Sequence, residues 1–169
     1  MSTSVPTALP AATKAKVLVV GIGNPSRGDD ALGPMFIDLA GKALAGEITR
    51  GEVELLTDFQ LQIEHTLDLQ GRERVVFVDA SVHAAAPFEY TRTQPGADHT
   101  HTTHAMSPEA LLGTYRDVMG EPPLSFTLAI RGEQFELGEP LTAEACTHLD
   151  AAVAFFCRSL HEALHARTG

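Results

Sequence analysis

Four residues whose side chains can bind a metal ion or move a proton stand beside predicted strands and helices: Asp29, Asp30, Asp79 and His104. The aspartates follow the ends of apolar runs, and His104 precedes a predicted helix. Ligands of an open α/β sheet bind outside the carboxyl ends of its strands. Asp30, Asp79 and His104 would supply two carboxylates and an imidazole, which suit a borderline divalent cation such as Zn²⁺ or Ni²⁺. Three protein ligands leave coordination positions open, as in a working metal site.

Each of these residues also has an ordinary structural interpretation. Asp30 could serve only as a helix cap, and Asp79 could serve only to cap a turn. His104 is one of eight histidines in the chain. We interpret His99 and His101 as residues of a polar loop, because such loops often collect histidine. Composition and spacing alone therefore leave the metal site as a hypothesis.

The elements that must position these residues alternate between strands and helices. Apolar runs without alternation predict strands buried on both faces, and an alternating segment predicts an edge strand. The predicted strands are Lys16–Ile22, Val53–Leu56, Arg74–Ala80, the edge strand Phe88–Thr93, and Leu124–Ile130. This pattern predicts an α/β fold with a mostly parallel five-stranded sheet that is covered on both faces.

Helical spacing and end signals predict four helices. They begin at Asp29 or Asp30 with Pro34 in or near the first turn, at Leu61, at Pro108, and after Thr142. We expect Asp29 or Asp30 to cap the first helix, because a carboxylate there accepts unpaired amide groups. Ser107 is expected to cap the third helix in the same way. The second helix is expected to stop at Gly71.

Length and charge limit the organisation and the partners. The 169 residues predict one domain at residues 15–169, after a disordered lead at residues 1–14 that is rich in Ser, Thr, Ala and Pro. The formal net charge of −10 argues against binding to nucleic acid and to anionic membranes. The sequence contains no run of about 18 apolar residues, so we expect no transmembrane helix.

The two cysteines, Cys146 and Cys157, both fall in the last predicted helix. Eleven residues of helix would separate them by about 16 Å, too far for a disulfide. We expect them to be free and buried, which is typical of a reducing compartment and predicts a cytoplasmic protein.

Four stretches of the sequence, in order, resemble the motifs of the hydrogenase maturation proteases: Gly21–Pro34, Val76–Ala80, His104–Leu112 and Ile130–Ala145. The resemblance covers roughly Lys16 to Leu164. It implies a three-layer α/β/α sandwich. It also implies an endopeptidase that removes the C-terminal extension from the large-subunit precursor of nickel–iron hydrogenase after nickel insertion.

The same resemblance implies roles for individual residues. Asp30, Asp79 and His104 correspond to the family's metal-contacting residues, and nickel is expected to arrive bound to the cysteines of the precursor. Other divalent cations could occupy the same ligands. Nickel could polarise the scissile carbonyl or activate a water, or one carboxylate could act as general base. Two departures from the family are an aspartate where some members have glutamate at position 30, and Ala31 where many have glycine.

The loop before Asp30 is expected to shape the site. The turn at Gly21, Gly23 and Asn24 would let backbone approach the ligand closely. Asp29 is expected to hold the loop rather than to bind the metal. The expected partner is the hydrogenase large-subunit precursor, and a monomer is expected.

Other function classes fit the sequence less well. It contains no Gly-x-Ser-x-Gly elbow, no cysteine beside a loop histidine and no His-Glu-x-x-His helix, so a serine, cysteine or standard zinc peptidase is disfavoured. A nucleotide-binding module would need a third glycine where Ser26 stands, and Asp29 and Asp30 would repel a pyrophosphate.

Two further alternatives remain. A peptidyl-tRNA hydrolase also begins with a strand and Gly-x-Gly-Asn-Pro, but its later motif is absent and the acidic charge suits tRNA poorly. A non-catalytic nickel-binding chaperone would use the same residues, and only an activity measurement distinguishes it.

Overall fold

A computed structural model of the chain describes residues 13–96 and 106–166. The strands are β1 (Val17–Ile22), β2 (Val53–Asp58), β3 (Arg74–Ser81), β4 (Phe88–Arg92) and β5 (Leu124–Arg131). They form a five-stranded sheet in the order β2-β1-β3-β5-β4. All neighbours are parallel except β4, which runs antiparallel to β5 at one edge. The mostly parallel sheet and its edge strand are therefore confirmed.

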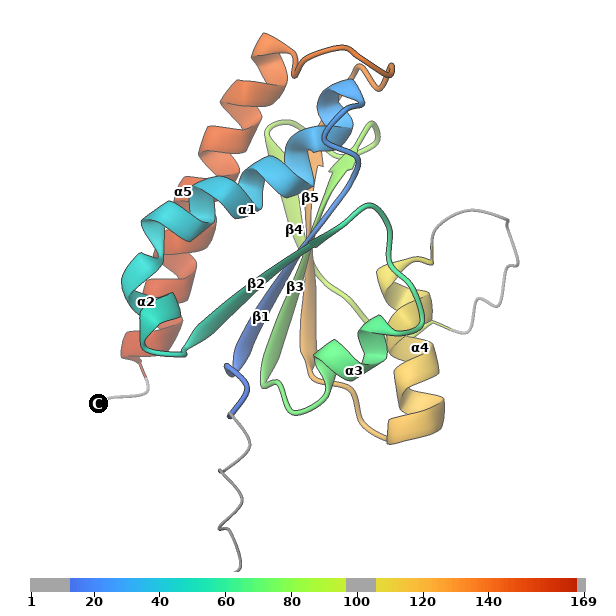
Figure 1. Cartoon of the computed structure of the whole chain (residues 1–169), viewed down its shortest axis with the longest axis vertical. Helices are drawn as coiled ribbons and strands as arrows, with labels where there is room; N and C mark the ends of the chain where they lie inside the picture. Colours follow the sequence, from blue (N-terminus) through green and yellow to red (C-terminus); the bar gives the residue numbers. More distant parts are fainter. Residues whose placement is uncertain (1–12, 97–105, 167–169) are drawn as a thin grey trace, which may run out of the picture.

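Helices cover both faces of this sheet (Figure 1). The helical elements are the 3₁₀ turn η1 (Gly28–Ala31), α1 (Leu32–Ala43), α2 (Ala45–Thr49), α3 (His65–Leu69), α4 (Pro108–Met119) and α5 (Ala143–His165). Figure 1 shows α1 and α5 on one side of the sheet and α3 and α4 on the other. The result is the predicted three-layer α/β/α arrangement.

The two-sided cover explains the uninterrupted apolar runs. In β1, Val17 and Val19 join the core under α1 and α5, whereas Leu18, Val20 and Ile22 join the core under α3 and α4. Successive side chains of a strand point to opposite faces, so a strand with a core on both faces needs apolar residues at every position.

The start of the first helix differs from the prediction. Neither Asp29 nor Asp30 caps α1, which begins at Leu32 after the 3₁₀ turn and has Ala31 at its N-cap, without a side-chain cap. Pro34 does lie in its first turn. The expected cap at Ser107 is confirmed, because Ser107 accepts from Ala110 N–H. The last helix begins after Thr142 as predicted, and Thr142 accepts from Ala145 N–H. The second predicted helix is shorter than expected, since only His65–Leu69 is helical.

The cysteine prediction is right in one respect and wrong in another. Cys146 and Cys157 are free, but Cys146 is exposed and Cys157 is only partly buried. The inward face of α5 carries Ala145 and Leu149, so Cys146 is turned away from the core.

Residues 1–12, most of the predicted lead, lie outside the described residues. Within the described part of the chain, no helix has the length and apolar character needed to cross a membrane.

Candidate functional site

The loop after β1 holds Asp30 in place through backbone contacts. Gly23 N–H donates to the carbonyl oxygen of Asp58 (3.1 Å), and Asn24 N–H donates to Asp30 Oδ2 (2.8 Å). Gly23 has a φ of 144°, and a Cβ at this position would collide with the carbonyl oxygen of Asp30. A glycine is therefore required where the chain passes Asp30.

Gly21 serves packing between β1 and α1. A Cβ on Gly21 would collide with Ile37 and with the carbonyl oxygen of Gly33, and one on Gly33 would collide with backbone of Ile22. The close approach that the structure shows at Gly21 and Gly23 is thus between parts of this chain. Approach of this backbone to a ligand stays a prediction.

Asp79 lies in β3 and faces the charge of Asp30. Burial, and then the negative charge of Asp30, raise the pKa of Asp79 to about 7, although a backbone hydrogen bond at Ala80 opposes the rise. Two carboxylates that influence each other in this way lie close together. Asp30 lies in η1, which contacts β3, so both aspartates lie at the carboxyl-end edge of the sheet.

The third predicted ligand, His104, lies outside the described residues, as do His99 and His101. The described residues on either side of that segment have backbone contacts, one with α4 and one with Leu61. Gly96 N–H donates to the carbonyl oxygen of Glu109 (2.9 Å), and Met106 forms an isolated antiparallel bridge with Leu61. Among residues 13–96 and 106–166, no three His, Cys, Asp or Glu side chains gather into a metal-binding group.

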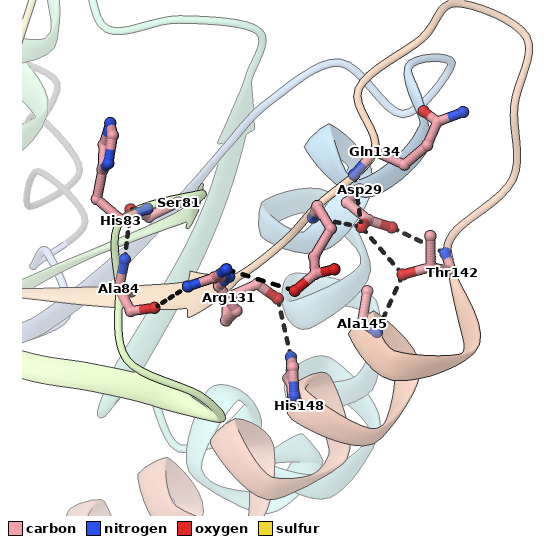
Figure 2. A network of polar contacts seen from close by, with 10 residues as sticks. Asp29, Ser81, His83, Ala84, Arg131, Gln134, Thr142, Ala145 and His148 are labelled. Carbon is pink, nitrogen blue, oxygen red and sulfur yellow. Dashed lines mark hydrogen bonds and ion pairs between the residues drawn. The ribbon is translucent and has the colours of Figure 1, made fainter.

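Asp29 has a different environment from its neighbour Asp30. Its side chain is fully buried and accepts four hydrogen bonds (Figure 2), from the backbone N–H groups of Glu133, Gln134 and Thr142 and from the Thr142 hydroxyl. Burial opposes ionisation, but these hydrogen bonds outweigh burial and hold the pKa of Asp29 below its ordinary value. Asp29 thus fastens the segment after β5 to η1, the loop-holding role expected for it.

Thr142 connects this network to α5. Its hydroxyl donates to Asp29 Oδ2 (3.0 Å) and accepts from Ala145 N–H (3.2 Å). The sequence predicts that the last helix begins after Thr142, but the second partner, Asp29, lies 113 positions away. No local pattern in the sequence indicates this contact.

Arg131 cross-links the same edge of the sheet and has no role in the sequence-based hypothesis. Its Nη1 donates to the carbonyl oxygen of Ala84 (3.0 Å), and its Nη2 lies 3.4 Å from Glu133. Ser81, its partner in register on β3, accepts from the backbone N–H groups of His83 and Ala84 (Figure 2). The rim between β3 and β5 is therefore fixed by polar contacts.

Asp58 and His65 form a second polar pair, beside the end of β2. His65 Nε2 lies 3.3 Å from Asp58 Oδ2, and Gln62 N–H donates to His65 Nδ1 (2.8 Å). His65 Nδ1 also lies 3.1 Å from the carbonyl oxygen of Gln62, so both ring nitrogens have polar partners. A hollow of about 290 Å³ opens next to this pair, lined by Gly23, Pro25, Pro34, Thr57, Asp58 and Phe59.

The arrangement suits proton transfer and cation binding. Asp79, with a pKa of about 7, can take or release a proton near neutral pH, which is the property of a general base or acid. Asp30 and Asp79 together offer carboxylate oxygens to a divalent cation. Such a cation would favour the ionised form of Asp79.

Comparison with known proteins gives structural relatives only. No family model and no curated protein matches the chain. The hydrogenase maturation protease HycI from Thermococcus kodakarensis superposes with a TM-score of 0.66 over 87% of this chain and 93% of its own, at 17% identity. The hydrogenase maturating endopeptidase HybD from E. coli gives a TM-score of 0.66 over 88% and 93%, at 21% identity.

A third solved structure has a similar fold. The hydrogenase 2 maturation peptidase from a Thaumarchaeota archaeon gives a TM-score of 0.59 over 86% of this chain and 97% of its own, at 24% identity. These superpositions cover nearly the whole length of each solved structure. The chain therefore has the fold of the hydrogenase maturation proteases.

Proposed function

We propose that this protein is an endopeptidase that removes the C-terminal extension of a nickel–iron hydrogenase large-subunit precursor. The proposal is supported by the positions of Asp30, in η1, and Asp79, in β3, at one edge of a sheet whose fold is shared with hydrogenase maturation proteases. Ligands of open α/β sheets bind at this edge.

Nickel enters the proposal as part of the substrate. Nickel held by cysteines of the precursor would complete its coordination with Asp30, Asp79 and His104. This contact would admit only nickel-loaded precursor and would place the scissile bond beside the carboxylates. Because the ion comes with the precursor, two ordered carboxylates and one histidine suffice on this chain.

Two routes to hydrolysis are consistent with the carboxylates. In one, nickel polarises the scissile carbonyl or activates the attacking water. In the other, Asp79 accepts the proton of the attacking water, a role supported by its raised pKa of about 7. Asp30, held by Asn24 N–H, would then orient the substrate. We further propose that the protein acts as a monomer in the cytoplasm, a compartment in which free cysteines such as Cys146 and Cys157 persist.

The test is the intact mass of a cognate precursor after incubation with this protein, with and without nickel loading. We expect loss of a C-terminal peptide only from nickel-loaded precursor, and no loss with Asp30→Asn, Asp79→Asn or His104→Ala. Asp38→Asn, at an exposed aspartate of α1, is the matched control and should cleave normally.

Two other outcomes of this test would each contradict a different part of the proposal. Equal cleavage without nickel would keep the protease and remove nickel from its mechanism. Binding of nickel-loaded precursor without any cleavage would favour the non-catalytic chaperone.

A further inference from the structure

Strand β2 has one side that no described strand pairs with. It lies at the edge of the sheet, next to β1. Val17 N–H donates to the carbonyl oxygen of Glu52, and Gly23 N–H donates to that of Asp58, so the even-numbered residues point their backbone groups toward β1. The N–H and C=O of one residue point to the same side of a strand, and neighbours alternate. Val53, Leu55 and Thr57 therefore point theirs outward.

The outer side of β2 lacks the features that usually prevent strand addition. Natural edge strands carry lysine, proline or bulges, or are very short. The six residues of β2, Val-Glu-Leu-Leu-Thr-Asp, include no lysine and no proline. Its one charged side chain before Asp58, that of Glu54, is paired with the buried Arg72 (2.6 Å).

The opposite edge of the sheet, formed by β4, carries features that oppose strand addition. Strand β4 has five residues, follows Pro87 and carries the exposed side chains of Glu89 and Arg92. These are typical of an edge protected against pairing. Within the described sheet, β2 is therefore the edge better suited to accept a further strand.

The end of β2 is connected by backbone contacts to the loop that holds Asp30. Its last residue, Asp58, accepts from Gly23 N–H, and the next residue of that loop, Asn24, holds Asp30. The 290 Å³ hollow lies at this end, and its wall residue Phe59 is 65% exposed. Its exposed ring offers apolar surface that a peptide side chain could cover.

A second hollow lies at the other end of β2. It has a volume of about 470 Å³ and is lined by Thr13, Lys14, Ala15, Ile48, Gly51, Val53, Glu54 and Leu55. Six residues of strand span roughly 20 Å, the length of a short extended peptide. Peptides that add to a sheet edge gain affinity from backbone hydrogen bonds and specificity from pockets for alternate side chains.

We propose that β2 binds the C-terminal region of the precursor as a sixth strand of the sheet. The peptide backbone pairs with Val53, Leu55 and Thr57, and two of its side chains enter the hollows at the ends of β2. In this arrangement the scissile bond lies beyond the Asp58 end of β2, toward Asp30 and Asp79. The inference rests on the proposed function for the identity of the peptide.

A proline at position 57 tests the pairing. Thr57 is exposed and its N–H points outward, so Thr57→Pro removes a donor for the incoming strand without removing a hydrogen bond to β1. We expect KM for nickel-loaded precursor to rise at least tenfold while kcat changes less than threefold. Thr57→Val keeps the N–H and should therefore raise KM less than Thr57→Pro does.

Arg92→Pro is the matched control on the other edge. Thr93 N–H donates to the carbonyl oxygen of Ser125, so the odd-numbered residues of β4 face β5 and Arg92 points its N–H outward. This variant should leave KM unchanged. An equal rise in KM for Arg92→Pro, or none for Thr57→Pro with its circular dichroism and Tm as in wild type, would overturn the proposal.

Amide hydrogen exchange, followed by NMR, tests the proposal independently of cleavage and of how Thr57→Pro folds. The probe is a synthetic peptide that contains the precursor's extension and the ten residues before it. We expect the amides of Val53, Leu55 and Thr57 to exchange at least tenfold more slowly with the peptide, while those of Glu54 and Leu56 change little. This alternation distinguishes strand addition from general stabilisation.

The exchange experiment also distinguishes which polypeptide pairs with the edge of β2. Unchanged exchange at saturating peptide overturns the inference even if the precursor is cleaved normally. Slow exchange of the three amides before peptide is added, lost when residues 1–12 are deleted, would assign the edge to this chain's own start. Slow exchange that depends on protein concentration would assign it to a second copy. Peptide-induced protection without precursor cleavage would support the strand pairing and contradict the proposed protease.

Discussion

Asp29 and Asp30 are neighbours in sequence and have opposite environments. Asp29 is fully buried among four donors, which together keep its pKa below the ordinary value. Asp30 is partly exposed, accepts from Asn24 N–H and contributes to the raised pKa of Asp79. The same residue type therefore stabilises the fold at one position and is available for chemistry at the next.

Hydrogen-bond donors account for the difference. A carboxylate surrounded by backbone N–H groups stays ionised and has its oxygens occupied. A carboxylate with one donor and a second carboxylate nearby keeps free lone pairs and creates a strong negative field, which suits a cation or a proton. The comparison can be tested by changing each carboxylate in turn.

The largest effect is expected on activity from Asp30→Asn. Removing this charge takes away one proposed nickel ligand and half of the carboxylate pair, so cleavage of nickel-loaded precursor should fall by about 10³-fold or more. Unfolding in urea should change by less than about 1 kcal/mol, since Asn can still accept from Asn24 N–H. Cleavage within tenfold of wild type would remove Asp30 from the chemistry.

The second-largest effect is expected on the pH dependence of stability, through the raised pKa of Asp79. The pKa of the Asp79 carboxyl is about 7 in the folded protein, against an ordinary value of 3.8, so the folded protein binds more protons than the unfolded one between these pH values. Stability therefore falls as pH rises through this window. Asp79→Asn removes that loss and should be more stable than wild type at pH 8, by on the order of 4 kcal/mol at most.

Urea unfolding of wild type and Asp79→Asn at pH 4, 5.5, 7 and 8 measures this difference. The gap between the two proteins should widen from pH 4 to 7 and then level off. A constant gap across the series would contradict the raised pKa of Asp79. The exposed Asp38→Asn serves as the control for a general change in net charge.

The third effect is a loss of stability in Asp29→Ala. Three backbone N–H groups, of Glu133, Gln134 and Thr142, lose their acceptor in a buried place, and each such loss costs about 1–3 kcal/mol. We expect about 3 kcal/mol or more of lost unfolding free energy by urea titration. Asp38→Ala should lose less than about 0.5 kcal/mol. A loss below about 1 kcal/mol for Asp29→Ala would show that water replaces the carboxylate.

Much of the fold could be predicted because its signals are local. The apolar run of β1 indicates a strand with a core on both faces, and Ser107 before Pro108 indicates a helix start. The start of α1 could not be predicted in the same way. An aspartate before an apolar helix looks like a cap, and only the distant partners of Asp29 show that its carboxylate is used elsewhere.

The candidate site was predictable to the extent that it depends on strand ends. Asp79 lies near the end of β3 and Asp30 in the turn after its parallel neighbour β1, so strand order places both at one edge of the sheet. The raised pKa of Asp79 depends on burial and on its distance from Asp30, which the sequence does not contain. The outward N–H groups of β2 depend on strand order, since the same residues would be paired in the middle of a sheet.

The smallest effect is expected for Thr142, which links Asp29 to α5. Thr142→Val removes the donor to Asp29 Oδ2 and the acceptor for Ala145 N–H, and the lost helix cap alone costs about 1 kcal/mol. Asp29 keeps its three backbone donors, so the total should stay near 1–2 kcal/mol and below the loss in Asp29→Ala. Thr142→Ser keeps both hydrogen bonds and should lie within about 0.5 kcal/mol of wild type. If Thr142→Val costs as much as Asp29→Ala, the backbone donors contribute little, and the low pKa of Asp29 would have to come from the hydroxyl.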